Sequence, residues 1–280
     1  MIIKRILSRL TTELSIYMPL WNAKENDKVI VSLTSYPARL PKLHIVIKSL
    51  LRQTMHPGKI LLWLGEDTKE SDITKKLRTL EKKSKGYFEI RTGCENIRPH
   101  KKYFYAMQEF SDKAIITVDD DLIYDKNLVR DLWNSYEKYQ DCVSARRVNL
   151  MTKNEDGELN EYNDWKWEYK KELKPSFALL PTGCGGVLYP PHILPENTFD
   201  LKAIKEHCLN TDDIWLKFME LKNNVKVVFT NSRIVHPLTL RNSQKTALMH
   251  SNAESKTENR NDINIRKMQI FTGILLKDYC

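Results

Sequence analysis

Three consecutive carboxylates, Asp119, Asp120 and Asp121, are the residues of this chain best suited to do chemistry. They follow directly on Ala114–Val118, an apolar and β-prone run with the composition of a buried strand. Unpaired charges are costly to bury, so acids at the end of a core strand need a cation or a water-filled cleft. If the backbone stays extended, Asp119 and Asp121 converge while Asp120 points away.

Two convergent carboxylates suit a hard divalent cation that also holds substrate phosphates. The pattern therefore predicts a Mn²⁺ or Mg²⁺ site at Asp119 and Asp121. A polar turn after a strand, with an Asp that caps the next helix, is the other interpretation of the same residues. His236, far along the chain, is either a metal ligand or a histidine satisfied within the core.

The first half of the chain alternates between β-branched runs and helical patterns. Strands are predicted at 28–33, 59–64, 88–92 and 114–118, with amphipathic helices between them. This alternation is typical of an α/β fold with a parallel, doubly wound sheet, in which ligands bind beyond the carboxyl ends of the strands. The segments expected at that edge are Thr34–Tyr36, Glu66–Asp67, Asn96–Lys102 and Asp119–Asp121.

Local signals refine this outline. Pro37 and Pro41 predict a rigid, non-helical loop over Thr34–Leu40. Ser71 or Asp72 is expected to cap the helix that carries Ile73, Leu77 and Leu80 on one face. The chain has no GxGxxG and no GxxxxGK[ST] motif, so neither the usual dinucleotide fold nor a P-loop ATPase is supported. Any nucleotide must then be held by side chains and loop amides.

Lysines and glycines supply candidate binding groups. Lys101 and Lys102 can hold a diphosphate, or they form a solvated pair at the start of a helix. In the run Pro181–Pro191, Gly183 and its neighbours permit a close backbone approach to a ligand or a positive φ.

A second acidic pair opens a predicted helix. Thr211 is a natural cap, and Asp212 and Asp213 fall in the first turn, where the helix dipole favours acids. The functional interpretation is that one of these carboxylates is a general base. Trp165 and Trp167, in a polar insert, are interpreted as packing residues in preference to platforms for a sugar ring.

Bulk properties narrow the class of protein. The 280 residues are 41% hydrophobic and 29% charged, a globular composition. The net charge of +9 indicates an anionic partner, and the absence of nucleic-acid module signatures argues against nucleic acid. Five scattered cysteines without a CxxC pair favour a reducing, cytoplasmic location and argue against structural zinc.

The N-terminal segment is amphipathic, and no stretch is apolar and long enough to span a membrane. Ile3, Ile6, Leu7 and Leu10 recur at helical spacing, with basic residues between them. Such a helix lies on an anionic membrane surface, or it docks on the protein or on a second subunit; both interpretations stay open. The chain is expected to consist of an N-terminal helical extension at 1–27, a main domain at 28–240, and a C-terminal loop and helix at 241–280.

The ordered motifs TSYPARL, HKKY, TVDDDLIY, GCGGVLYPP and TDDIWLK resemble bacterial nucleotide-sugar glycosyltransferases of the GT-A fold, closest to enzymes of capsule or lipopolysaccharide assembly. The resemblance covers roughly residues 28–237. It implies a Rossmann-like GT-A domain, with a mainly parallel central sheet flanked by helices and a smaller acceptor-side region.

The resemblance also implies roles for the residues. Asp119 and Asp121 match the DxD motif that binds Mn²⁺ or Mg²⁺, with His236 as a further metal ligand. Asp213 matches the carboxylate that takes the acceptor proton, although Asp212 stays open because many relatives have Glu-Asp here. Residues expected around the nucleotide sugar are Thr34, Tyr36, Arg39, Glu66, Lys101, Lys102, Asp120, Gly185 and Gly186.

The implied activity is transfer of a sugar, with inversion, from a nucleotide diphosphate donor, expected to be a UDP-sugar. The acceptor would be a glycan or a lipid-linked glycan, and the enzyme would be cytoplasmic, with peripheral contact to the inner membrane. Two alternatives remain at this point. A sugar nucleotidyltransferase normally needs an early glycine-rich phosphate loop, which TSYPARL lacks. A non-catalytic protein on the same fold would bind sugar or sugar nucleotide without turnover.

Overall fold

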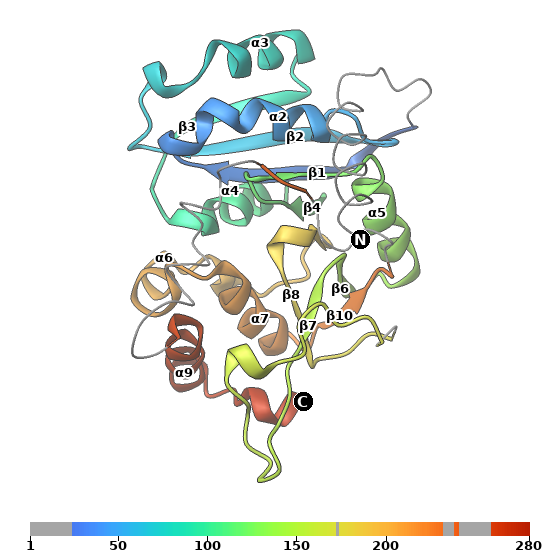
Figure 1. The fold of residues 1–280 in the computed structure, drawn as a ribbon, viewed down its shortest axis with the longest axis vertical. Coiled ribbons are helices and arrows are strands. Elements are labelled where there is room, and N and C mark those ends of the chain that lie inside the picture. Colours follow the sequence, from blue (N-terminus) through green and yellow to red (C-terminus); the bar gives the residue numbers. More distant parts are fainter. Residues whose placement is uncertain (1–23, 172–173, 232–237, 241–258) are drawn as a thin grey trace, which may run out of the picture.

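The computed structural model describes residues 24–171, 174–231, 238–240 and 259–280. Its centre is a seven-stranded sheet with the order β10-β6-β9-β4-β1-β2-β3 (Figure 1). The strands are β1 (Lys24–Ser35), β2 (Met55–Gly65), β3 (Phe88–Cys94), β4 (Ala114–Thr117), β6 (Cys142–Ala145), β9 (Val187–Tyr189) and β10 (Lys226–Phe229). All neighbours pair in parallel except β9, which runs antiparallel to β4 and β6. The predicted mainly parallel α/β sheet is confirmed.

The register of the parallel strands brings their carboxyl ends to one edge. Ser35 of β1 lies opposite Leu64 of β2, and Thr117 of β4 lies opposite Ser32. Apolar, β-branched runs fill these strands because the sheet is covered on both faces. The polar segments that follow each strand are therefore collected in one place.

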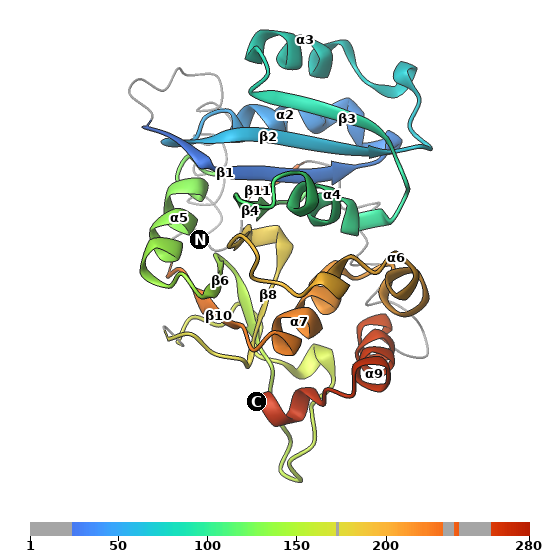
Figure 2. The same cartoon turned by 180° about the vertical axis from the view of Figure 1, so that it is seen from behind.

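Helices cover the two faces of the sheet with separate cores (Figures 1 and 2). The helices are α2 (Leu40–Leu50), α3 (Lys75–Ser84), α4 (Lys101–Glu109), α5 (Leu128–Lys138), α7 (Asp212–Lys222) and α9 (Arg260–Thr272). Apolar residues of α2, α3 and α5 share one buried cluster with the strands. Those of α7 and α9 share a second cluster with β6, β8, β9 and β10. None of the described helices has the length and apolar character needed to cross a membrane.

Short elements complete the described chain. Two small antiparallel pairs join β5 (Leu122–Ile123) to β11 (Leu238–Thr239), and β7 (Val148–Leu150) to β8 (Leu179–Pro181). The short helical segments are η1 (Pro37–Arg39), η2 (Glu70–Asp72), η3 (Arg98–His100), η4 (Tyr162–Asp164), η5 (Gly183–Gly185), η6 (Glu196–Phe199), α6 (Leu201–Ala203), η7 (Ile204–Cys208) and η9 (Leu276–Tyr279).

Two local predictions were wrong, and a third was right only in the position of the residue. The loop after β1 is not free of helix, because Pro37 opens η1 and Pro41 stands in the first turn of α2, where a missing N–H costs nothing. The cap of α3 is Thr74, whose hydroxyl accepts from the Leu77 N–H, so that helix starts later than expected. Thr211 occupies the N-cap of α7, but its hydroxyl accepts from Asn264 of α9 and makes no capping bond.

The predicted division into three regions stays a proposal. Residues 1–23 lie outside the described part, and β1 begins at Lys24, ahead of the expected boundary after residue 27. At the other end, α9 packs against α7 in the second core.

Candidate active site

Lys102, in the first turn of α4, connects the two acidic groups that the sequence singled out. Its Nζ lies 2.9 Å from Asp119 Oδ1, beyond β4, and 2.8 Å from Asp212 Oδ2, at the start of α7. The Lys102 side chain is only 5% exposed and Lys101 is buried too, so of the two interpretations of this pair the solvated one was wrong. Although burial opposes the charged form, the surrounding carboxylates hold the pKa of Lys102 above its ordinary value.

A buried histidine fixes the start of α4 against the segment that leads into α7. His100 Nε2 is 2.9 Å from the Cys208 carbonyl oxygen, and Nδ1 is 2.8 Å from the Tyr103 hydroxyl. A carbonyl only accepts, so Nε2 carries the proton and Nδ1 accepts from Tyr103. Burial lowers the pKa of His100 to about 4, which keeps the ring neutral. Lys102 is therefore positioned by contacts that span more than a hundred residues.

Asp213, beside Asp212, is held by the backbone of Gly183. The Gly183 N–H donates to both carboxylate oxygens, at 3.2 and 3.3 Å. Burial, with the adjacent Asp212 as the second cause, raises the pKa of Asp213 to about 8. A side chain on Gly183 would clash, because its Cβ would lie 2.7 Å from Lys102 Nζ and 3.3 Å from Asp119 Oδ1. The glycine thus allows these charged groups to gather around one point.

The remaining acids of the triplet face the end of β1. Asp120 Oδ2 accepts from the Ser35 hydroxyl at 2.6 Å, and its Oδ1 is paired with Arg39. Asp121 Oδ2 lies 3.3 Å from the same guanidinium. The expected alternation therefore does not hold strictly, because β4 ends at Thr117 and the backbone turns at Asp120–Asp121. Burial, together with the nearby charge of Asp119, raises the pKa of Asp121 to about 6.

The other predicted lysine takes part in a separate network. Lys101 is buried, and its Nζ donates to Asn96 Oδ1 at 2.8 Å. The Asn96 amide in turn donates to Asp67 Oδ2 at 2.9 Å. Asp67, and not the neighbouring Glu66, therefore makes the side-chain contact at this end of β2. Asp67 follows β2 and Asn96 follows β3, so the contact between their side chains joins two of the segments that were expected at this edge.

The remaining predicted contacts of the nucleotide sugar differ in position. Thr34 bonds the backbone of β2 through its hydroxyl, 2.8 Å from the Trp63 carbonyl oxygen. Tyr36 is half-buried, with the Arg39 guanidinium 5.3 Å from its ring centre. A residue with a side chain in place of Gly185 would collide with Arg147, and the positive φ of Gly186, 88°, also favours glycine.

The donor atoms at the carboxyl edge fit a divalent cation that is completed by a substrate. Among the residues that the structure describes, no group of three or more His, Cys, Asp and Glu side chains is arranged to hold a metal. Asp119 lies close enough to Asp121 for its charge to contribute to the raised pKa of Asp121, and the Asp119 side chain is 32% exposed. One or two carboxylates with phosphate oxygens and water form a usual Mg²⁺ site. His236, the predicted third ligand, lies outside the described residues.

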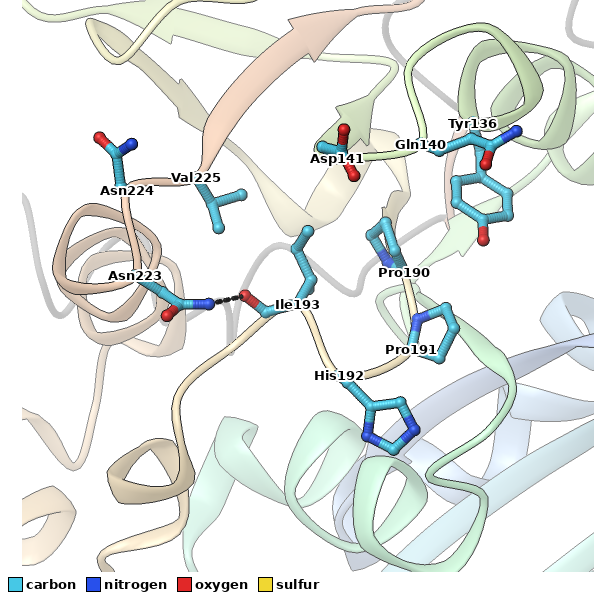
Figure 3. Close-up of a pocket in the computed structure, with 10 residues that line it drawn as sticks. All are labelled: Tyr136, Gln140, Asp141, Pro190, Pro191, His192, Ile193, Asn223, Asn224 and Val225. Carbon is cyan, nitrogen blue, oxygen red and sulfur yellow. Dashed lines mark hydrogen bonds between the residues drawn. The ribbon is translucent and has the colours of Figure 1, made fainter.

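A pocket on the molecule lies at the opposite edge of the sheet (Figure 3). Its lining includes Asp141 and Val225, which precede β6 and β10, and Pro190 and Pro191, which follow the antiparallel β9. These positions are the amino ends of the parallel strands. The pocket therefore contains none of the predicted site residues.

Removal of the Lys102 charge is expected to destabilise the protein. The Lys102→Met variant leaves Asp119 and Asp212 without their buried cation, a change that typically costs about 3–5 kcal/mol. Urea unfolding followed by circular dichroism measures the loss. The matched control is Lys101→Met, which removes a buried lysine whose Nζ donates to the Asn96 amide oxygen. Equal stability of Lys102→Met and the wild type would show that the ion pairs contribute nothing.

The raised pKa of Asp213 predicts a pH-dependent stability. In the unfolded chain its carboxyl loses the proton near the ordinary value of 3.8, but in the folded protein only near 8. Between these values the folded state binds more protons, so rising pH favours unfolding. The Asp213→Asn variant, which cannot ionise, is expected to exceed the wild type in stability by at least about 1 kcal/mol at pH 8. Urea titrations from pH 4 to pH 8 should show this difference growing; a constant difference would contradict it.

Comparisons with known proteins agree with this architecture. The mannosyltransferase PcManGT of Pyrobaculum calidifontis, solved with GDP-Man and Mn²⁺, superposes with a TM-score of 0.55 at 9% identity, over 98% of this chain and 76% of that one. GalNAc-T7, solved with UDP, GalNAc and Mn²⁺, has a TM-score of 0.53 at 10% identity, over 88% of this chain and 48% of that one. No curated protein sequence matches the chain.

At these identities the likeness shows a shared fold, the Rossmann-like GT-A type that the sequence predicted. The sequence evidence goes further. Residues 30–188, more than half of the chain, match the sequence model of one family, which is described as "Glycosyl transferase family 2". This span contains the acidic triplet, Lys102 and the Gly183 turn. The chain therefore belongs to glycosyl transferase family 2 and is a glycosyltransferase.

Proposed function

We propose that the protein transfers a hexose from a nucleoside diphosphate donor to a hydroxyl of a glycan or lipid-linked glycan, with a divalent metal and with inversion. One observation carries the proposal: Lys102 joins Asp119 to Asp212, with Asp213 held next to them by Gly183. A group for the leaving diphosphate and a group for the acceptor proton thus share one small site. A nucleotidyltransferase and a non-catalytic binder are set aside by the family.

The structural neighbours support the nature of the donor. PcManGT was solved with GDP-Man and Mn²⁺, and GalNAc-T7 with UDP and Mn²⁺. GDP-Man and UDP both contain a nucleoside diphosphate, and both were bound together with Mn²⁺. A divalent cation of this kind fits the acidic triplet of this chain. We propose Asp119 and Asp121 as the residues that hold Mn²⁺ or Mg²⁺. When bound there, the cation would stabilise the negative charge that grows on the leaving diphosphate.

Asp213 is the proposed general base. Asp212 Oδ2 is engaged by the Lys102 ammonium at 2.8 Å, so this carboxylate already has a fixed partner in the site. Asp213 accepts from the Gly183 N–H, and burial together with the charge of Asp212 raises its pKa to about 8. A base with a pKa near the working pH is effective in proton transfer.

The proposed chemical step is a displacement at the anomeric carbon of the donor sugar. The acceptor oxygen forms a bond to the anomeric carbon from the face opposite the diphosphate, and its proton passes to Asp213. The bond between the anomeric carbon and the phosphate oxygen breaks, and its electron pair stays with the diphosphate. Lys102 contributes a fixed positive charge at the same place without reorganisation of solvent.

The finer assignments extend this proposal. Arg39, Tyr36 and Asp120 at the end of β1, with Asp67, Asn96 and Lys101 beside β2, would surround the nucleoside of a UDP-sugar. We further propose a role in bacterial capsule or lipopolysaccharide assembly, on the cytoplasmic side and peripheral to the inner membrane. The net charge of +9 and the amphipathic pattern of the first residues support contact with an anionic surface.

A donor screen tests the proposed function. The protein is incubated with UDP- and GDP-sugars, with Mn²⁺ or with EDTA, and the released nucleoside diphosphate is measured. Metal-dependent release from at least one donor is expected, together with a thermal shift by that nucleotide and Mn²⁺. Release that EDTA leaves unchanged would exclude the metal, and release of pyrophosphate in its place would exclude sugar transfer. Retention of configuration in an NMR time course would exclude inversion.

A further inference from the structure

We infer that Trp167 forms a platform on which a pyranose ring of the acceptor stacks, beside Asp213. The inference rests on the proposed function, which it deepens by locating the acceptor. Trp165, two residues earlier, is 3% exposed and bonds the Asn160 carbonyl oxygen through its indole N–H. Trp167 is 40% exposed. The prediction that both tryptophans pack the insert therefore accounts for Trp165, but leaves the surface of Trp167 unexplained.

The indole of Trp167 is held in a fixed orientation by two neighbours. The Arg147 guanidinium lies 5.8 Å from its ring centre, and the ring of Tyr162 meets it edge-on, at 5.5 Å and 80°. Cation–π and edge-to-face contacts each favour one geometry of the ring. The exposed surface is thus a rigid one, which binds a ligand at little entropic cost.

The backbone around Trp167 is fixed as well. Lys166 exchanges two hydrogen bonds with Leu150 of β7, at 2.9 and 3.1 Å. Glu168 adopts a positive φ of 50°, which a residue with a side chain rarely takes, and its N–H donates to Asn149 Oδ1. Strained backbone that is held by its surroundings often marks a functional position. The residues on both sides of Trp167 are therefore hydrogen-bonded to β7, which anchors the turn that carries the indole.

A chain of contacts connects this platform to the proposed base. Arg147, below the indole, donates from Nη1 to the Thr182 hydroxyl at 2.8 Å. Thr182 precedes Gly183, whose N–H holds Asp213. Tyr162, whose ring contacts the indole edge-to-face, is buried close enough to Asp213 for that carboxylate to raise its pKa further. The indole thus belongs to the structure that surrounds the proton acceptor.

The chemistry of this place suits a sugar. One face of a pyranose carries C–H groups that pack on an aromatic ring, and the hydroxyls at its rim bond charged and polar groups. Glu168, whose side chain is 39% exposed, and Arg147 supply an acceptor and donors beside the indole. An aromatic surface with a few placed polar groups is the usual make-up of a small-molecule site. The occupant that we propose is the terminal pyranose of the acceptor glycan.

Saturation-transfer NMR tests the platform. The probes are methyl pyranosides of glucose, galactose, mannose and N-acetylglucosamine, added to the full chain with and without UDP and Mn²⁺. At least one probe is expected to receive saturation, mainly on the C–H protons of one face. The Trp167→Ala variant should weaken its affinity about 2- to 10-fold, and Trp167→Phe should restore most of it.

Two controls separate this inference from the proposed function. Trp133→Phe alters a tryptophan of α5 that bonds Glu137, and it should leave probe binding unchanged. Slow donor hydrolysis without acceptor should be equal in Trp167→Ala and the wild type. If the wild type hydrolyses no donor, the proposed function is contradicted. Binding of the pyranoside probes can still be measured in that case, so the two outcomes are distinguishable. A wild type that binds no probe, or a Trp167→Ala variant that binds as tightly, would overturn the platform.

Discussion

The Asp213→Asn variant is expected to lose turnover by about 10²- to 10⁴-fold, the usual contribution of a placed general base. Asparagine keeps the size of the side chain and still accepts from the Gly183 N–H, so the site should keep its shape. Donor affinity should stay within a few fold of the wild type, because the role proposed for Asp213 concerns the acceptor proton and not the diphosphate. Initial rates with the donor found by the screen, and calorimetry with the same nucleotide, measure the two quantities.

The pH profile sharpens this prediction. A base must be deprotonated to act, and the pKa of Asp213 is raised to about 8 by burial and by Asp212. The wild-type kcat/KM is therefore expected to rise with pH up to about 8, and the residual rate of Asp213→Asn should not follow this rise. Asp212→Asn is the matched comparison, since it removes the partner of Lys102 but leaves the base. A near-normal rate for Asp213→Asn would move the base to Asp212 or elsewhere.

The Asp121→Asn variant is expected to abolish metal-stimulated turnover and to keep the fold. The amide removes the charge that a Mn²⁺ ion needs, but it can still accept from Arg39. Since burial already raises the pKa of Asp121 to about 6, a neutral side chain at this position should be tolerated. Turnover as a function of Mn²⁺ concentration, with a thermal melt of each protein, gives both results.

Asp120→Asn is the control for that experiment. Asp120 bonds Ser35 and Arg39 at the end of β1. Loss of its charge should therefore lower the affinity for the donor and leave the dependence of turnover on Mn²⁺ in place. An Asp121→Asn enzyme with the wild-type response to Mn²⁺ would remove this residue from the metal site.

The general fold was predictable because it depends on periodicity. Strands and helices alternate visibly up to Asp121, and the parallel sheet follows from that order. The direction of β9 was not predictable, because a three-residue apolar run such as Val187–Tyr189 fits a parallel and an antiparallel strand equally well. The cap of α3 was missed because Ser71, Asp72 and Thr74 are all capable of the role, and only the structure selects Thr74.

The site was predictable by residue type but not by contact. Lysine is rarely buried, so the burial of Lys101 and Lys102 was not expected from sequence. It depends on His100, which binds Cys208 across more than a hundred residues. Gly183 was named only as one glycine of a run, since its closeness to Lys102 arises from the packing of β8 on α7.

The central claim is that Asp119 and Asp121 hold a cation against the diphosphate of the donor, and one measurement tests it directly. Crystals of the wild type are grown with Mn²⁺ and UDP or GDP, and anomalous differences are collected at the manganese edge. One strong peak is expected within bonding distance of both Asp119 and Asp121, with the diphosphate next to Lys102. A manganese peak and a nucleotide bound elsewhere, away from these carboxylates, would contradict it.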